Sequence, residues 1–299
     1  MLGVLRTMCN TLSVNDCRAY KIMPTAPRLD RLTSLLTGLM PRIQIRHMGD
    51  LADAAAVAAE SADCLHLHLV VAGNVEFDSR AGTQTLNAPA ITVFRNEQAH
   101  GLRPLDDAPC RVFCAEAFFD GPAAPLLLEA FDVPLFLPMT AAMPGLTQTI
   151  QLVALEVESP RCGGGVLLSH AGEILLIGLL RHLLSNQILP RGVLAGLADP
   201  GLARALVAVH SQPAAPWSLE AMAETAGVSR TTFAERFRDN LGITPRRYLN
   251  AFRLTIARRE IDAGRGLKRA AQAAGYESPA ALSRALSRVA NETEAKSAA

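Results

Sequence analysis

The sequence predicts an α+β protein with a small β-barrel and a helical region in its N-terminal two thirds, followed by an all-α domain. Three observations lead to this fold class: short alternating strands between about Ile43 and Phe119, helical periodicity over 121–210, and a helical pattern that occurs twice after Trp217. A length of 299 residues, of which 49% are hydrophobic, favours two domains with substantial cores.

The chain is expected to begin with an extension and a short helix. Residues 1–27 lack regular patterning, a sustained apolar segment and a small-residue cleavage site, so we expect a disordered extension rather than a secretory signal. Residues 29–41 have the spacing of a short amphipathic helix.

Four segments of the next region have the pattern of strands. Residues 64–73 (CLHLHLVVAG) alternate in polarity and end at a glycine, and residues 74–86 have the pattern of a hairpin that turns at Ala81 and Gly82. Residues 90–96 (AITVFRN) and 110–119 (CRVFCAEAFF) are further strands. Several short strands at close spacing are typical of a small barrel or sandwich, and we expect a barrel within 28–140.

Three helices are expected over 144–158, 165–187 and 199–210, in a region delimited as 141–210. The second helix contains the most apolar segment of the chain, but four polar groups within it argue against a membrane span. Its apolar surface is broader than a surface helix needs in a monomer, so we expect it to form a dimer contact. The residues concerned are Leu168, Ile174, Leu175, Leu176, Ile177, Leu179, Leu180 and Leu183.

After a short linker that contains two prolines, the chain has the pattern of two capped helices joined by a tight turn. Ser218 is expected to cap the first helix and Gly227 to end it. Ser229 is expected to cap the second helix, in which Phe233 and Phe237 pack inward while the first turn stays polar. This is a helix-turn-helix arrangement, whose second helix can enter the major groove of DNA.

The same pattern returns over 267–289, with a turn at Gly275, a cap at Ser278 and Leu282 in the place of Phe233. One long helix over 245–264 separates the two units, and ~17 helical residues span roughly 26 Å. Such a spacer suits two recognition helices in successive major grooves, which are about 34 Å apart. A generic helical bundle is the alternative, but two matching units in a basic block favour a tandem helix-turn-helix domain.

Charge is unevenly distributed along the chain. Residues 217–288 contain 13 Lys and Arg against 7 Asp and Glu, whereas the remainder contains 16 against 21. A basic block attached to a mildly acidic body is typical of a module that binds a polyanion. If the polyanion is DNA, we expect phosphate contacts from Arg236, Arg238, Arg246, Arg247, Arg284 and Arg288, each of which is otherwise a solvated surface charge.

Two C-terminal segments carry specific motifs: WSLEAMAETAGVSRTTFAERFRDNLGITPRRYLNAFRLTIARREI and AAGYESPAALSRAL. They resemble the DNA-binding domain of AraC/XylS-type transcription regulators, over residues 217–290. Through weaker features, such as HLVVAG and RNEQAHGL, residues 28–210 are similar to the cupin-like sensor domain of one branch of that family. The resemblance implies a cytoplasmic, dimeric DNA-binding regulator whose barrel senses a signal.

The resemblance also implies base contacts from the exposed positions of both recognition helices. Two departures from the family pattern matter. The segment NETEAKSAA replaces a usual GxSPxxYR motif, so 291–299 is expected to be a tail without the last stabilising helix. The second recognition helix is poor in side chains that hydrogen-bond to bases, so specificity is expected to depend on the first. The implied positions are Arg230, Thr231, Thr232, Ala234 and Glu235 in the first helix, and Pro279, Ala280, Ser283 and Arg284 in the second.

Three histidines of the expected barrel are candidates for effector binding. His66 and His68 alternate with leucines and so share one face of a strand, and His100 lies at the end of a later strand. Cupin enzymes hold a metal with two or three His and a Glu, but Glu76 is the nearby carboxylate in sequence and RNEQAH lacks the usual PxGxxH turn. We therefore expect no metal or other cofactor, and keep barrel-lining histidines and effector contacts as alternatives.

The direction in which these histidines point decides between the alternatives. A wholly structural barrel turns its leucines inward and leaves the histidines in water. Inward imidazoles cost free energy unless each finds a partner, such as Glu116, a bound effector or a shared metal. We expect His66 and His100 to face the same cavity.

The six cysteines are spread along the chain without a CxxC pair, which fits a reducing cytosol. Cys110 and Cys114 are expected on one strand about 13 Å apart, too far for a mutual disulfide. Either could pair with Cys64 or act as a lone thiol in a redox switch. The alternative for all three is that they are small buried hydrophobic residues.

Together these features predict a cytoplasmic, non-enzymatic transcription regulator, expected to be an activator. Its expected partners are double-stranded DNA, a second copy of the chain, RNA polymerase and a small-molecule effector, and no membrane. A metal-dependent cupin enzyme fused to a DNA-binding domain and a thiol redox switch are the rival hypotheses.

Overall fold

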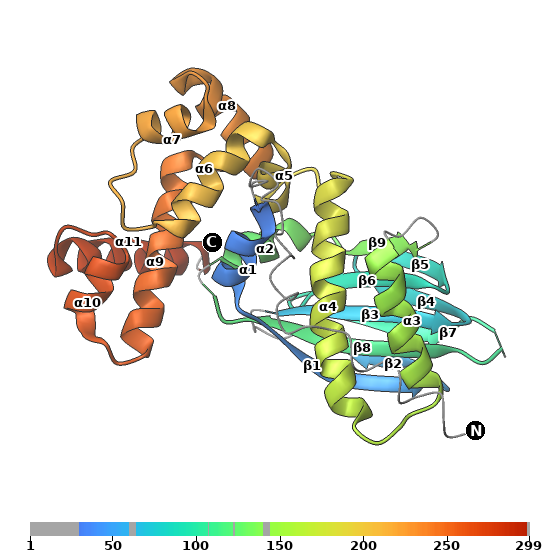
Figure 1. The fold of residues 1–299 in the computed structure, drawn as a ribbon. Coiled ribbons are helices and arrows are strands. Elements are labelled where there is room, and N and C mark those ends of the chain that lie inside the picture. Colours follow the sequence, from blue (N-terminus) through green and yellow to red (C-terminus); the bar gives the residue numbers. More distant parts are fainter. Residues whose placement is uncertain (1–29, 60–63, 107, 122, 140–143, 298–299) are drawn as a thin grey trace, which may run out of the picture. The chain divides into compact units, whose positions relative to one another are not determined.

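The computed structural model describes residues 30–59, 64–106, 108–121, 123–139 and 144–297 (Figure 1). The contacts divide the chain after Asp30, and the elements below belong to the unit that begins at Arg31. The extension expected over 1–27 lies outside the described residues.

The strands form two antiparallel sheets. The five-stranded sheet has the order β1 (Pro41–Asp50), β8 (Arg111–Phe119), β3 (Cys64–Ala72), β6 (Ala90–Arg95) and β9 (Leu135–Pro138). The four-stranded sheet has the order β2 (Ala55–Val57), β7 (His100–Pro104), β4 (Asn74–Ser79) and β5 (Gly82–Asn87).

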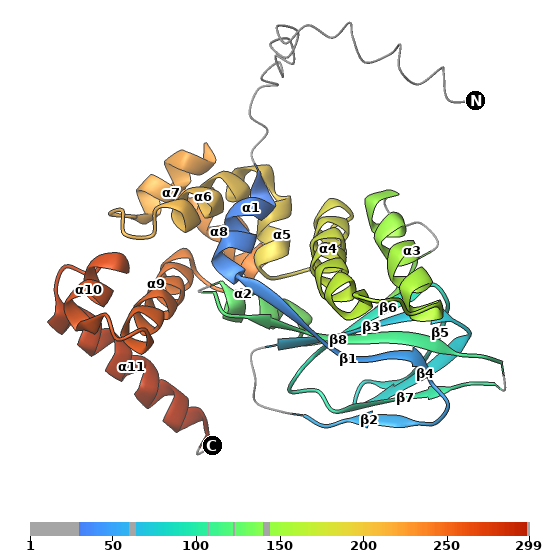
Figure 2. The same ribbon diagram turned by 60° about the horizontal axis from the view of Figure 1, so that its bottom comes forward.

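The expectation of a closed barrel was wrong, because the two sheets face each other without a common hydrogen-bonded ladder (Figure 2). Side chains join them: Val70, Phe77, Phe94, Leu102 and Val112 belong to one buried cluster that draws on both sheets. Residues that point inward alternate along a strand in a sandwich just as they do in a barrel. The sequence pattern therefore could not distinguish the two arrangements.

Strand β3 is buried on both faces, which the sequence reasoning did not anticipate. Leu65, Leu67 and Leu69 pack in the large core that includes the helices, whereas His66 and His68 lie on the opposite face, between the sheets. Helices α3 (Pro144–Glu158) and α4 (Gly164–Ser185) cover the leucine face (Figure 2). A central strand with both faces covered needs no solvent-exposed side, so leucines and histidines are both interior.

Among the described residues, six α-helices precede the C-terminal domain, and three of the predicted ones are present with bounds that agree to within two residues. The amphipathic helix expected at 29–41 is also present, as α1. The short α2, α5 and a 3-10 turn at Glu129–Phe131 were not predicted, nor were β1, β2, β7 and β9 as separate strands. The helices are α1 (Arg31–Leu39), α2 (Ala124–Leu128), α3 (Pro144–Glu158), α4 (Gly164–Ser185), α5 (Val193–Ala198) and α6 (Pro200–Ser211).

The prediction that α4 presents a broad apolar dimer surface needs correction. Leu179 is 1% exposed, and the other leucines proposed for that surface are buried with it in the core of this chain. Ile174 is 53% exposed and Ile177 is half-buried, so these two alone among the eight reach the surface of the described chain. By length and composition α4 is apolar enough to cross a membrane. Its leucine face is buried in the core of the chain, whereas residues of the opposite face are exposed.

The C-terminal domain consists of five helices, in which α9 separates the α7–α8 pair from the α10–α11 pair (Figure 1). The prediction of a tail over 291–299 is wrong for residues 291–297, because α11 continues in one helix to Ser297. The helices are α7 (Leu219–Ala226), α8 (Arg230–Leu241), α9 (Pro245–Asp262), α10 (Gly266–Ala273) and α11 (Pro279–Ser297).

The predicted caps are confirmed. The hydroxyls of Ser218, Ser229 and Ser278 each accept a hydrogen bond from the backbone N–H three residues later, at 3.1, 3.2 and 3.1 Å. Gly227 and Gly275 end the preceding helices with φ of 72° and 71°, a conformation that glycine adopts without strain. Each serine cap stabilises its helix by about 1 kcal/mol.

The two helix-turn-helix units have different cores. Large aromatic residues fill the first, where Phe233, Phe237 and Phe252 are all at most 2% exposed. A separate cluster of four alanines and two leucines fills the second, namely Leu254, Ala257, Ala270, Ala271, Ala274 and Leu282. Phe233 and Leu282 occupy equivalent places in their units, as predicted, and both are fully buried.

Candidate functional site

The first recognition helix, α8, exposes the polar turn that the sequence singled out. Ser229 caps the helix, while Phe233 and Phe237 anchor its inner face, so Arg230 and Thr231 project from its exposed N-terminal turn. Glu235 is exposed one turn further along, and Ala234 is half-buried. Helix N-termini favour anions, because their first N–H groups are unpaired.

Two of these residues already have partners within the domain. Arg230 Nη1 lies 2.6 Å from Glu220 Oε1 of α7, and both side chains are well exposed. A surface ion pair of this kind contributes little, ~0–1 kcal/mol, so a base edge can replace Glu220 at small cost. The hydroxyl of Thr232 lies 2.8 Å from that of Ser229, which ties Thr232 to the cap rather than to the outer surface.

The arginines proposed for phosphate contacts are all exposed in the structure. Arg246 and Arg247 lie in the first turn of α9, where Thr244 caps the helix. Arg238 and Arg246 line a cavity of about 640 Å³ with Ala234 and Trp217, so the proposed base and phosphate contacts border a common hollow. Arg236 has a long contact of 3.9 Å with Asp199, and Arg284 and Arg288 lie on α11.

The second recognition helix, α11, offers fewer polar groups. Pro279, Ala280, Ser283 and Arg284 are exposed, as the resemblance implies. Two of these four residues have no side-chain donor or acceptor, so this helix supplies shape and a phosphate contact more readily than base-specific hydrogen bonds.

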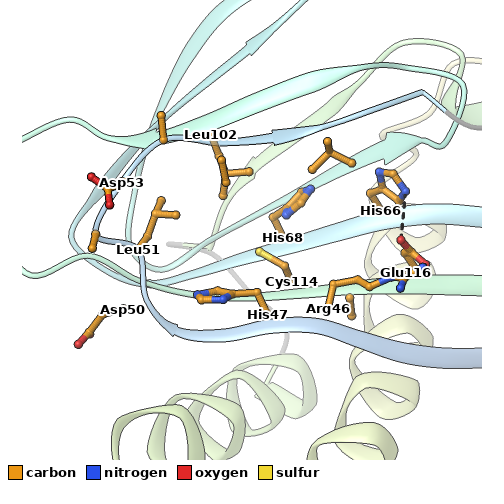
Figure 3. Close-up of a pocket in the computed structure, with 15 residues that line it drawn as sticks. Arg46, His47, Asp50, Leu51, Asp53, His66, His68, Leu102, Cys114 and Glu116 are labelled. Carbon is orange, nitrogen blue, oxygen red and sulfur yellow. Dashed lines mark ion pairs between the residues drawn. The ribbon is translucent and has the colours of Figure 1, made fainter.

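A second site lies in the N-terminal domain, where a cavity of about 440 Å³ opens beside β3 (Figure 3). His66 and His68 line it from β3, and Cys114 and Glu116 line it from the neighbouring β8. In this ladder His66 lies directly opposite Glu116 and His68 directly opposite Cys114, so all four side chains share one face of the sheet. The rest of the lining is Arg46, His47, Asp50, Leu51, Ala52, Asp53, Ala54, Ala55, Val57, Leu102 and Ala115.

The three candidate histidines are buried and lie close together, but His100 is not among the residues that line the cavity, so the expectation that His66 and His100 face the same cavity is not confirmed. His66 and His68 are each 3% exposed and His100 is 5% exposed. His68 Nε2 lies 2.8 Å from His100 Nε2, and the rings of His66 and His100 are 5.3 Å apart between centroids. The ring of His100 stacks on Phe94 at 3.9 Å between centroids, which fixes its plane.

Glu116 is the carboxylate partner expected for an inward imidazole. Its Oε1 atom lies 3.7 Å from His66 Nε2, and its Oε2 atom lies 2.6 Å from Arg46 Nη2 (Figure 3). Glu76, the other carboxylate considered from sequence, pairs instead with Arg103.

Burial holds the histidine pair neutral. Desolvation, followed by the proximity of His100 and His66, lowers the pKa of His68 well below its ordinary value. Desolvation lowers the pKa of His100 to about 4, although its hydrogen bond to Gln98 acts in the opposite direction. Both imidazoles are therefore uncharged near pH 7 and can each donate one hydrogen bond and accept another.

The described residues contain no group of three or more His, Cys, Asp or Glu side chains arranged to hold a metal ion. The contact between His68 and His100 is a hydrogen bond between two ring nitrogens.

The cysteine candidates are buried and apart from one another. Cys64 of β3 lies opposite Phe118 of β8, and Phe118 is four residues further along β8 than Cys114. Cys110 lies just before β8. Burial raises the pKa of the Cys110 thiol and raises that of Cys114 to about 12. Thiols react as thiolates, so both are poorly suited to rapid oxidation.

Several lining residues were missed by the sequence reasoning. Arg46 and Leu51 come from β1 and the loop after it, and Val57 comes from β2. The alternation in RIQIRHM, at 42–48, was the available signal for β1. Nothing in the local sequence shows that the loop at 51–54 folds over the histidine face.

Comparison with known proteins agrees with this two-part structure. Residues 30–185 match a family model described as Cupin, and residues 222–295 match one described as a helix-turn-helix domain. A Streptomyces lividans protein named as an AraC-like transcription regulator is 42% identical over 122 residues, which are 40% of this chain and 40% of the relative. The transcriptional regulator AlkR of Acinetobacter baylyi is 26% identical over 261 residues, 76% of this chain and 85% of the relative.

The alignments differ in extent, since the chain spans only 40% of the length of the two Streptomyces relatives it matches. Among solved structures, an apo form of ToxT from Vibrio cholerae aligns over 82% of this chain and 92% of its own, with 13% identity and a TM-score of 0.34. The AraC-like transcriptional activator CuxR aligns over 81% and 92%, with 10% identity and a TM-score of 0.28.

The chain belongs to the family described as Cupin through residues 30–185, and it carries a helix-turn-helix domain over residues 222–295. In this arrangement it is similar to relatives that are named as AraC-like or helix-turn-helix transcription regulators.

Proposed function

We propose that this chain is a one-component regulator in which a small molecule bound in the N-terminal cavity controls transcription from DNA sites bound by α8 and α11. The observation that carries the proposal is a cavity of about 440 Å³ with buried, neutral imidazoles, in a chain that also presents two capped recognition helices. Its volume lies in the range of small-molecule sites.

The regulator is proposed to act in the cytoplasm as a homodimer that activates transcription with RNA polymerase. Support for this part comes from the family, because the matched relatives are named as transcription regulators. The apolar face of α4 is not the dimer surface proposed here, since that face is buried within the chain.

Binding to duplex DNA should weaken steeply with salt. If the proposed arginines neutralise ~6 phosphates, log K should fall against log[salt] with a slope of about −5, because each phosphate contact releases condensed counterions. Fluorescence anisotropy of the full chain with a labelled duplex, over a salt series, measures this slope. A flat response would exclude the DNA-binding role, whatever the cavity binds.

Residues in the first turn of α8 should determine the sequence specificity of DNA binding, whereas Arg247 should contribute to the affinity for any DNA sequence. Arg230→Ala or Thr231→Ala should relax sequence preference by ~1–3 kcal/mol, because these residues occupy the exposed first turn of α8. Arg247→Ala should weaken binding to all sequences alike and lower the salt slope by about 1. The measurement is the affinity for a selected site and for random DNA, and equal losses on both for all three variants would contradict the division.

A further inference from the structure

The hydrogen bonds around His100 fix which of its ring nitrogens carries the proton. His100 Nδ1 lies 2.8 Å from the backbone carbonyl oxygen of Gln98. A carbonyl oxygen only accepts hydrogen bonds, so Nδ1 must carry a proton and donate it. In a neutral imidazole the other nitrogen is then unprotonated, and His100 Nε2 is an acceptor.

The state of His100 determines that of His68. His68 Nε2 lies 2.8 Å from the acceptor His100 Nε2, so His68 Nε2 must carry the proton of that hydrogen bond. His68 Nδ1 is consequently a lone pair. It is buried and has no hydrogen-bond partner among the described residues. The two hydrogen bonds, from His100 to Gln98 and from His68 to His100, thus leave His68 Nδ1 as an acceptor without a donor, on a residue that lines the cavity.

The surroundings of His68 are mainly apolar. Leu51, Val57 and Leu102 line the same cavity, and Figure 3 shows His68 between Leu102 and Cys114. Among the charged lining groups, Arg46 pairs with Glu116, and Asp50 lies 3.0 Å from Arg111 Nε. The cavity therefore combines a broad apolar wall with an unsatisfied acceptor at His68 Nδ1.

We propose that this cavity binds an apolar molecule that carries a hydroxyl group, and that the hydroxyl donates a hydrogen bond to Nδ1 of His68. This inference rests on the sensor role proposed above and names the chemical class of its effector. An unpaired buried acceptor is costly, and a hydroxyl removes that cost while the remainder of the ligand fills the apolar wall.

Other ligand chemistries fit the site less well. A hydrocarbon leaves His68 Nδ1 without a donor. A carboxylate has no proton to donate near pH 7 and brings a negative charge beside the lone pair and Glu116. A hydroxyl oxygen can also accept a weak hydrogen bond from Cys114, which faces His68 across the ladder and whose raised pKa keeps it a thiol.

Matched ligands test the donor requirement directly. Isothermal titration calorimetry of the full chain compares para-propylphenol with para-propylanisole, whose methyl group removes the proton but keeps the oxygen. Propylbenzene and para-propylbenzoate complete the series. We expect the phenol to bind roughly 10- to 100-fold more tightly than the anisole, because the anisole leaves a buried acceptor unpaired.

A variant locates the effect at His68. His68→Phe keeps an aromatic ring among Phe77 and Phe94 but has no acceptor, so it should bind the phenol and the anisole with equal affinity. The control is His170→Phe, at an exposed position of α4, which should preserve the preference.

A second measurement needs no variant and no ligand. Nitrogen-15 NMR of the histidine side chains should show His68 protonated at Nε2 and His100 protonated at Nδ1. Protonation of His68 at Nδ1 would overturn the inference. Equal binding of all four probes, tightest binding of the benzoate, or no binding of the phenol would overturn it as well.

These results are separable from a failure of the proposed function. A probe that alters DNA binding without any preference for the hydroxyl would leave a sensor standing and remove only its ligand class. Loss of the salt-dependent DNA binding would remove the regulator itself while leaving the histidine tautomers as inferred.

Discussion

The Leu179→Glu variant is expected to lose its native fold rather than to become a folded monomer. Leu179 is 1% exposed within the core shared by the helices and the five-stranded sheet. Removing a buried leucine costs ~2–5 kcal/mol, and burying an unpaired carboxylate adds several more. That sum approaches the whole stability of a typical domain, ~5–15 kcal/mol. Urea denaturation followed by circular dichroism measures the loss.

The matched control is Ile174→Glu on the same helix. Ile174 is 53% exposed, so the substitution should change the free energy of unfolding by no more than ~0.5 kcal/mol. Light scattering on both variants reports the oligomeric state. A Leu179→Glu protein that is folded and monomeric would show that the leucine face has a role between subunits after all.

Gly275→Ala should displace or unfold the second helix-turn-helix unit. Gly275 has φ of 71°, and a Cβ atom there would lie 2.6 Å from Ala214 Cα and 2.9 Å from its carbonyl oxygen. Backbone atoms cannot move aside as a flexible side chain can. The left-handed conformation alone costs alanine roughly 1–2 kcal/mol, and the collision adds to it, so we expect a total of at least ~3 kcal/mol.

Gly264→Ala separates the two contributions. Gly264 has φ of 72°, but no atom of the described residues lies within 4 Å of an added Cβ. It should therefore show only the conformational cost, ~1–2 kcal/mol. Hydrogen exchange in α10 and α11 measures both variants, with DNA affinity as a second readout. Equal effects of the two substitutions would contradict the proposed collision.

The C-terminal domain could be predicted in detail because its signals are local. Ser218, Ser229 and Ser278 each act on a backbone N–H three residues away, and Gly227 and Gly275 act through their own backbone angles. Such features depend little on the rest of the chain. The continuation of α11 to Ser297 escaped prediction because a family motif was expected there and its absence was taken as the end of the helix.

The N-terminal domain could be predicted less well because its signals depend on distant partners. The period of two in 64–70 correctly separated His66 and His68 from the leucines, but it could not show that helices cover the other face. The leucines of α4 were correctly identified as a surface that must be covered. Periodicity measures the width of such a surface and not whether its partner is the same chain or a second one.

The candidate sites divide in the same way. His66, His68 and His100 were found because histidines within apolar strands are unusual, whereas Leu51 and Val57 are ordinary residues brought to the cavity by a loop and a short strand. The hydrogen bonds from His100 to Gln98 and from His68 to His100 depend on the position of Gln98 and on the pairing of β7 with its neighbours. No local pattern encodes that arrangement.

The alanine-lined core of the second unit sets limits on how this regulator can diverge. Ala257, Ala270, Ala271 and Ala274 have no side-chain rotamers to adjust, and any larger residue would force α9 and α10 apart. The inner face of that unit is therefore nearly fixed in composition. Its outer face, with Ser283 and Arg284, is free to change without disturbing the packing. Changes in the DNA sequence that such a protein binds can therefore accumulate through substitutions on α11. The aromatic core of the first unit tolerates exchange between residues of similar volume, so more than one set of core residues can hold α8 in place.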